Sequence, residues 1–171
     1  MNEICACQGK DRLEKPKPQQ FKAVIFDMDG VLVDSEPLWK KSEYEVFTSL
    51  GVQVDDELAR LTQSMTTREV TNFWYERNPW TQVSIQEAEQ MVVARVIKLV
   101  QKEDFGMAGV KELVAQLKQK NIKTGLATNS PAAIIPHVLK KLELEQGFDV
   151  VLSADSVKRG KPAPDIYLHA A

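Results

Sequence analysis

The sequence contains little that would suit a membrane, secreted or nucleic-acid-binding protein. No apolar run approaches the ~20 residues that a helix needs to span a bilayer, so we expect no membrane partner. The net charge is only −2 over 171 residues, which gives no electrostatic reason to expect a nucleic acid as a partner. The two cysteines, Cys5 and Cys7, are too few for a metal site of their own, and we expect reduced thiols in a cytoplasmic protein.

The sequence does contain enough apolar material for a packed fold behind a polar leader. Hydrophobic residues make up 43% of the chain and charged residues 27%, and both fractions are ordinary for a folded enzyme. Residues 1–20, which include the run KPKPQQ, show no apolar periodicity and no apolar signal-peptide core. We therefore expect residues 1–20 to form a disordered leader.

The most informative motif is the pair Asp27 and Asp29, which follows the apolar run 23–26 and precedes Gly30. A short apolar run that ends in acidic residues fits the carboxyl end of a parallel strand, where open α/β sheets bind ligands. Past the strand end the two carboxylates need not point to opposite faces. One can attack phosphorus as a nucleophile while the other moves protons. Mg²⁺, with Asp27 and Asp29 as ligands, would offset their mutual repulsion.

A second cluster of polar residues follows the next predicted strand. The run 122–127 reads as a buried strand and leads into Thr128, Asn129 and Ser130. We expect Ser130 to cap a helix whose first residue is Pro131. The helix N-terminus and the polar side chains would then form a cradle for an anion beside the aspartates.

A lysine follows the third predicted strand, which covers residues 148–152. The segment 160–165 reads GKPAPD, and its prolines stiffen the loop that presents Lys161. The ammonium group of Lys161 can hold a phosphate and the nucleophilic carboxylate together. Three successive strands therefore each end in residues that suit phosphoryl transfer.

In this order the motifs resemble those of the haloacid dehalogenase-like phosphohydrolases, and most of all the branch that contains β-phosphoglucomutase, hexitol phosphatase and 2-deoxyglucose-6-phosphate phosphatase. The resemblance covers the chain beyond the leader, and the segment DSEPLW at 34–39 is most similar to the sugar-phosphate phosphatases. It implies that Asp27 is the nucleophile and Asp29 the acid and base. It also implies that Thr128 and Lys161 stabilise the transferred phosphoryl group.

The resemblance also implies the fold. It predicts an α/β protein in which a Rossmann-like parallel sheet core, residues 21–37 and 105–171, carries an inserted α-helical cap, residues 38–104. The sequence pattern of the cap region is helical, with caps and apolar stripes at helical spacing. The expected cap helices cover residues 38–50, residues 67–77 and a longer stretch that begins with the capping box at 84–87.

The implied reaction is Mg²⁺-dependent hydrolysis of a small sugar or sugar-alcohol phosphate through an aspartyl-phosphate. The partner is then a small phosphorylated metabolite, and we expect a monomer if the protein is full length. The candidate substrate-binding residues near the strand ends and in the cap are Gly30, Asn129, Ser130, Thr66, Thr67 and Arg68. Thr67 also suits a helix N-cap and Arg68 an exposed charge. Aromatic residues at 73–75 and Trp80 are expected to pack inside the cap rather than line a sugar pocket.

Two alternatives remain open from the sequence. A sugar phosphomutase would use the same core, but β-phosphoglucomutase has a histidine where Trp39 stands, which favours hydrolysis. The second alternative is a catalytically inactive truncated fragment. The family's fourth motif, an acidic pair that completes the Mg²⁺ site, has no counterpart before residue 171. We accordingly expect an incomplete sheet in which the first strand is an exposed edge, together with weak Mg²⁺ binding and little turnover.

Overall fold

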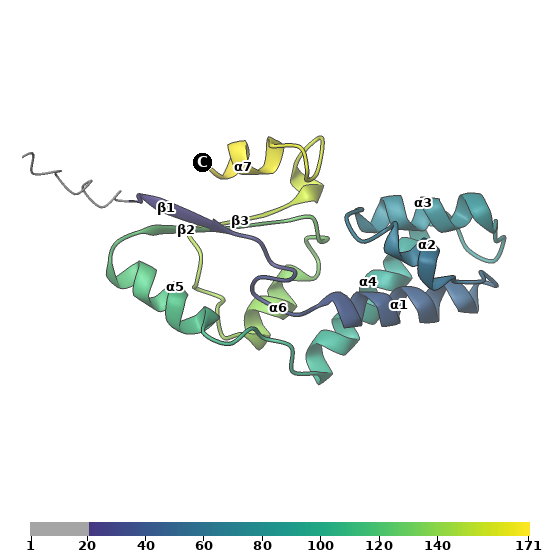
Figure 1. Cartoon of the computed structure of the whole chain (residues 1–171), viewed down its shortest axis with the longest axis horizontal. Helices are drawn as coiled ribbons and strands as arrows, with labels where there is room; N and C mark the ends of the chain where they lie inside the picture. Colours follow the sequence, from purple (N-terminus) through teal and green to yellow (C-terminus); the bar gives the residue numbers. More distant parts are fainter. Residues whose placement is uncertain (1–20) are drawn as a thin grey trace, which may run out of the picture.

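The computed structural model describes residues 21–171, and the expected leader at residues 1–20 lies outside the described residues (Figure 1). Three parallel strands form one sheet in the order β1 (Ala23–Phe26), β2 (Lys123–Thr128) and β3 (Val150–Ser153). The predicted α/β fold with a parallel sheet is confirmed. In the described part of the chain β1 pairs with β2 alone, so it is an edge strand as expected.

Helices cover both faces of the sheet (Figure 1). Helices α5 (Val110–Gln119) and α6 (Ile135–Lys141) lie below the sheet in this view, and α7 (Asp165–Ala170) lies above it. The middle strand is the most buried: five of the six residues of β2 are shielded from solvent. A single turn of 3-10 helix, η1 (Ala154–Ser156), follows β3. Because the three strands are parallel, their carboxyl ends all lie at the same sheet edge.

A helical insertion lies between β1 and α5, as predicted. It contains α1 (Glu36–Ser49), α2 (Asp56–Arg60), α3 (Thr67–Arg77) and α4 (Ile85–Lys102), and α4 packs against both α1 and α3. The structure confirms helices close to the predicted ranges. The short α2 was not predicted, because five residues without a buried side chain leave no apolar stripe to recognise. Within residues 21–171 no helix combines the length and apolar composition that crossing a bilayer requires.

Local capping fixes where two of these helices begin. The capping box predicted at the start of α4 is present, since Ser84 and Glu87 bond each other's backbone N–H groups. A second box, formed by Thr66 and Glu69, starts α3. Thr66, rather than Thr67, is therefore the N-cap of α3, while the Thr67 side chain is buried.

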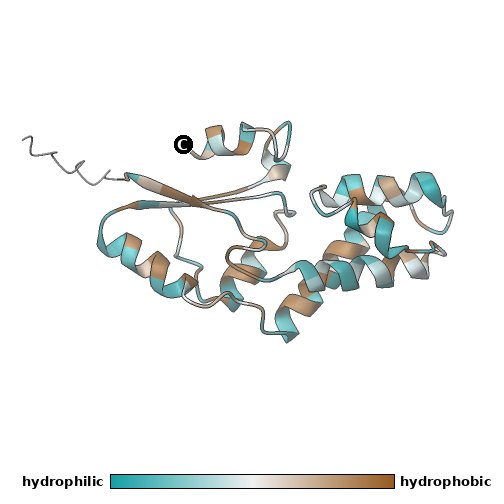
Figure 2. Ribbon diagram, in the orientation of Figure 1, coloured by the Kyte–Doolittle hydropathy of each residue, from teal (hydrophilic) through white to brown (hydrophobic). Residues whose placement is uncertain are grey.

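The aromatic residues at 73–75 and Trp80 pack inside the insertion, as predicted. Trp74 and Trp80 are buried, and their rings lie 6.3 Å and 6.0 Å from the Phe47 ring of α1. The Tyr75 ring meets Trp80 edge-on at 4.9 Å. Figure 2 shows the corresponding pattern, with hydrophobic and hydrophilic residues alternating along the amphipathic helices. These rings build the scaffold of the insertion.

Candidate active site

Asp27 and Lys161 meet at the carboxyl edge of the sheet. Lys161 Nζ lies 2.9 Å from Asp27 Oδ1 and also donates to the Ala127 carbonyl at 2.7 Å. The Met28 backbone N–H donates to the same Asp27 oxygen at 2.7 Å. The predicted contact between the lysine and the first aspartate is confirmed. Both donors use Oδ1, so no hydrogen bond within residues 21–171 occupies Oδ2 of Asp27.

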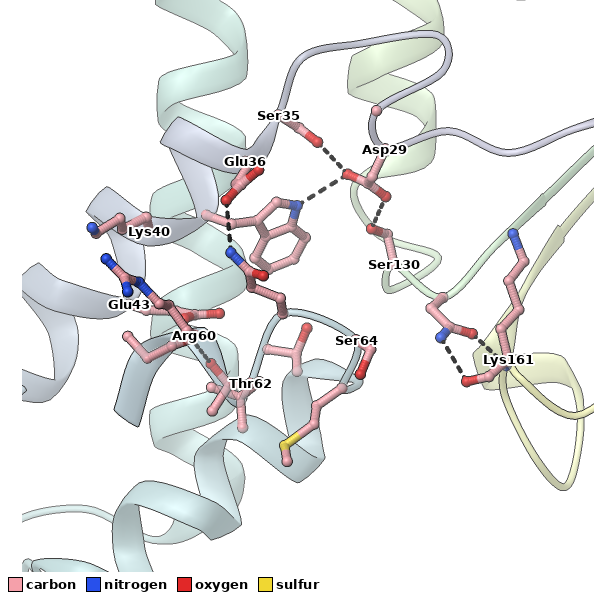
Figure 3. Close-up of a pocket in the computed structure, with 18 of the residues that line it drawn as sticks. Asp29, Ser35, Glu36, Lys40, Glu43, Arg60, Thr62, Ser64, Ser130 and Lys161 are labelled. Atoms are coloured by element: carbon pink, nitrogen blue, oxygen red, sulfur yellow. Dashed lines mark hydrogen bonds between the residues drawn. The ribbon is translucent and has the colours of Figure 1, made fainter. Parts of the chain in front are cut away.

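Asn129 fixes the loop that carries Lys161. Its side-chain amide donates to the Lys161 carbonyl at 3.1 Å, and its oxygen accepts from the Lys161 backbone N–H at 2.8 Å (Figure 3). A Cβ atom at Gly160 would lie 2.8 Å from the same Asn129 oxygen, so the loop can approach this closely only with glycine there. Asn129 also lines a cavity at this sheet edge, but the oxygen and nitrogen of its side-chain amide are already bonded to the Lys161 backbone.

Four side chains donate hydrogen bonds to the carboxylate of Asp29. Ser35 Oγ (2.5 Å) and Trp39 Nε1 (3.1 Å) reach Oδ1. Ser130 Oγ (2.6 Å) and Thr128 Oγ1 (3.2 Å) reach Oδ2. Figure 3 shows Asp29 between Ser35 and Ser130. The acidic residue predicted to move protons is therefore held by donors from several elements at once.

The structure corrects the role expected for Ser130. It does not cap a helix at Pro131, because α6 begins only at Ile135, after a turn closed by the Ile134 N–H and the Pro131 carbonyl. The Ser130 hydroxyl instead donates to Asp29, and its backbone N–H donates to Thr128 Oγ1 at 3.0 Å. A bond from a hydroxyl to a carboxylate is charge-assisted and stronger than one to a neutral group. The expected anion cradle at a helix N-terminus is therefore not at Ser130.

A cavity of about 750 Å³ lies between the sheet edge and the helical insertion. The sheet side contributes seven of the residues that surround it, and polar side chains of α1, α2 and the loop before α3 contribute most of the others (Figure 3). The sheet-side residues are Asp27, Asp29, Gly30, Asn129, Ser130, Lys161 and Pro162. The volume is sufficient for a small ligand of the size usually bound in protein clefts.

The predicted substrate residues of the insertion divide into two groups. Thr67 lines the cavity, whereas Thr66 does not and serves as the cap of α3. Arg68 is exposed and forms an ion pair with Glu89 of α4 at 3.2 Å. Arg68 belongs instead to a separate cavity of about 370 Å³ beside α4. A direct substrate contact by Thr66 or Arg68 does not fit this arrangement.

One face of α1 supplies site residues that the sequence analysis missed. Glu36, Trp39, Lys40 and Glu43 all line the cavity. Their spacing of three or four residues places them on one side of the helix, and this periodicity was the available signal. Glu43 is partly buried, and its burial raises the pKa of its carboxyl group from the ordinary 4.5 to about 7.

Mg²⁺ fits the donor set at Asp27 better than at the side chain of Asp29. The carboxylate of Asp27 is a hard oxygen donor beside the cavity, and Mg²⁺ needs few protein ligands because it keeps waters and substrate phosphates. Both carboxylate oxygens of Asp29 already accept hydrogen bonds, so its backbone carbonyl is the more suitable ligand. Across residues 21–171 no group of three or more acidic, histidine or cysteine side chains forms a ready-made metal site.

Comparisons with known proteins agree with this geometry. The family model described as haloacid dehalogenase-like hydrolase matches residues 21–171. The chain is 41% identical over 156 residues to hexitol phosphatase B of Escherichia coli (strain K12), covering 90% of this chain and 70% of that protein. It is 30% identical over 162 residues to β-phosphoglucomutase of Bacillus subtilis (strain 168), covering 88% and 69%. Among solved structures, CbbY from Rhodobacter sphaeroides in complex with phosphate has a TM-score of 0.77 at 25% identity, covering 88% and 71%.

Proposed function

This chain belongs to the haloacid dehalogenase-like hydrolase family, and we propose that it is a Mg²⁺-dependent phosphatase of small sugar or sugar-alcohol phosphates. The observation that carries the proposal is the pair of Asp27 and Lys161 at the wall of a polar cavity. The similarity to hexitol phosphatase B supports the substrate class. The alternative of a sugar phosphomutase is supported more weakly, by a lower identity to β-phosphoglucomutase.

In the proposed reaction Asp27 is the nucleophile. Its Oδ2, which accepts no hydrogen bond from the described residues, forms a bond to phosphorus while the bond from phosphorus to the leaving oxygen breaks. The Lys161 ammonium, 2.9 Å from Oδ1, orients the carboxylate and offsets charge on the phosphoryl oxygens. Bound Mg²⁺, held by Asp27 and the Asp29 carbonyl, would supply further positive charge.

Asp29 is the proposed acid and base. It protonates the leaving alcohol in the first step and removes a proton from the attacking water in the second. In the structure its carboxylate is held by Ser35, Trp39, Thr128 and Ser130. A substrate oxygen must therefore replace at least one of these donors before Asp29 can act. The Trp39 indole can donate a hydrogen bond but cannot accept a proton, which favours a phosphatase over a mutase that needs another proton carrier there.

The test is phosphate release by the full chain from hexitol and hexose phosphates, with and without Mg²⁺. The Asp27→Asn variant should lose turnover while it stays folded, whereas Asp104→Asn, at an exposed position outside the cavity, should match the wild type. A preference for nucleotides or phosphoproteins would contradict the proposed substrate class. Conversion of a sugar 1-phosphate to its 6-phosphate would favour the mutase, and a folded chain without any turnover would favour the inactive alternative.

A further inference from the structure

The cavity contains one carboxylate of the helical insertion that has no partner among residues 21–171. Three acidic side chains of the insertion line the cavity. Glu36 accepts a hydrogen bond from Gln63 at 3.0 Å, and Asp56 forms an ion pair with Lys40 at 2.9 Å. For Glu43 no hydrogen bond or ion pair occurs among residues 21–171. Of the three, Glu43 alone has both carboxylate oxygens without a hydrogen bond or ion pair in this part of the chain.

Burial also perturbs the carboxyl group of Glu43. It is partly buried on α1, one turn after Trp39, and burial raises the pKa of its carboxyl group to about 7. The cations of the insertion that share the cavity wall are Lys40 of α1 and Arg60 of α2, and neither pairs with Glu43. A buried carboxylate without a partner destabilises the folded state. A ligand that supplies hydrogen-bond donors would remove this cost.

We propose that Glu43 recognises hydroxyl groups of the leaving alcohol and so selects polyhydroxylated phosphate esters. The inference rests on the proposed function, because it takes the Asp27 end of the cavity as the phosphate end. Hydroxyl groups both donate and accept hydrogen bonds, so they can bind Glu43 in its ionised or its protonated form. A second phosphate in that place would face the carboxylate directly and be repelled when Glu43 is ionised.

The cavity accordingly has two chemically different ends. Lys161 contributes positive charge at the sheet edge, whereas Glu43 presents oxygen atoms from the insertion (Figure 3). An ester with a phosphate at one end and a chain of hydroxyls at the other matches both. An apolar ester of the same length would leave Glu43 buried and without a partner, and such mismatches reduce binding strongly.

The experiment measures ligand binding, so it does not depend on turnover. The full chain carrying Asp27→Asn is titrated with sorbitol 6-phosphate and with n-hexyl phosphate in the presence of Mg²⁺ by isothermal titration calorimetry. The hexitol ester is expected to bind roughly 10- to 100-fold more tightly, as one or two hydrogen bonds to a charged group provide. Adding Glu43→Met should remove this preference, while Glu43→Gln, which can still bond hydroxyls, should retain most of it.

A matched control is Glu57→Met on α2. Glu57 is exposed and lies outside the cavity, so this variant should keep the full preference. A preference that survives Glu43→Met in a folded protein, or equal binding of the two esters by the Asp27→Asn parent, overturns the inference. The proposed function is judged separately, by release of phosphate from hexitol phosphates in the wild-type chain. Loss of the preference in Glu43→Met alone supports the assignment.

Discussion

Removing the charge of Glu43 is expected to stabilise the protein at neutral and alkaline pH. Burial raises the pKa of this carboxyl group from 4.5 to about 7 in the folded state. Between these values the folded protein holds a proton that the unfolded chain has released, so the free energy of unfolding falls as the pH rises. At 1.36 kcal/mol for each pKa unit, the loss reaches about 3 kcal/mol above pH 7. The glutamine side chain of the Glu43→Gln variant cannot ionise, so this variant does not lose that stability as the pH rises.

Thermal unfolding of wild type and Glu43→Gln at several pH values between 4.5 and 8.5 measures this effect. For a protein of this size about 3 kcal/mol corresponds to roughly 6–12 °C in Tm. The two proteins should have similar Tm values at pH 4.5. As the pH rises to about 7.5, the Tm of the variant should exceed that of the wild type by an increasing amount. Other titrating groups are common to both proteins, so the difference between the two curves isolates Glu43.

The matched control is Glu57→Gln, an exposed position that should follow the wild-type curve at every pH. If the difference between Glu43→Gln and wild type does not change with pH, the carboxyl group titrates normally, and the reasoning from burial is wrong. A variant that becomes less stable above pH 7 would show that Glu43 has a favourable partner when ionised. Arg60 and Lys40, which line the same cavity, are the candidate cations of the insertion.

Three further predictions concern turnover and phosphate binding. Asp29→Asn should lower kcat by ~10²–10⁴-fold, the usual contribution of acid–base assistance, and a loss of only a few-fold would assign Asp29 a structural role. Lys161→Ala removes the ion pair to Asp27 and should weaken binding of a trigonal metal-fluoride mimic of the phosphoryl group, so unchanged affinity by calorimetry would contradict its placement. Trp39→Phe removes one hydrogen bond to Asp29. It should change kcat about 3- to 10-fold and alter the pH profile of kcat. An unchanged pH profile would show that the indole does not position Asp29.

The parts of the fold and site that local sequence signals determine could be predicted. The three strands and the contact between Asp27 and Lys161 follow from chain order, because carboxyl ends of neighbouring parallel strands meet at one edge. The start of α4 could be predicted because its capping box involves residues only three apart. In each case the interaction is either local or imposed by the sheet.

Other features depend on partners that are distant in sequence. Ser130 looks like an N-cap in its own segment, but the carboxylate of Asp29, which lies 101 residues earlier, takes its hydroxyl. Arg68 is polar and near a helix start, but its direction is set by Glu89 on the neighbouring helix. The raised pKa of Glu43 depends on how α1 and α2 enclose the cavity, which no pattern within α1 reveals. Side-chain direction was therefore the property that the sequence determined least.

The position of α1 connects the two ends of the proposed reaction. Trp39 donates to Asp29 across the boundary between the insertion and the sheet edge, and Glu43 lies on the same helix face one turn later. A helix moves as a nearly rigid unit, so a leaving group that binds Glu43 and shifts α1 also changes the distance from the Trp39 indole to Asp29. Since Asp29 must lose at least one donor before it can protonate the leaving oxygen, recognition of the alcohol and release of the acid would then occur in the same movement.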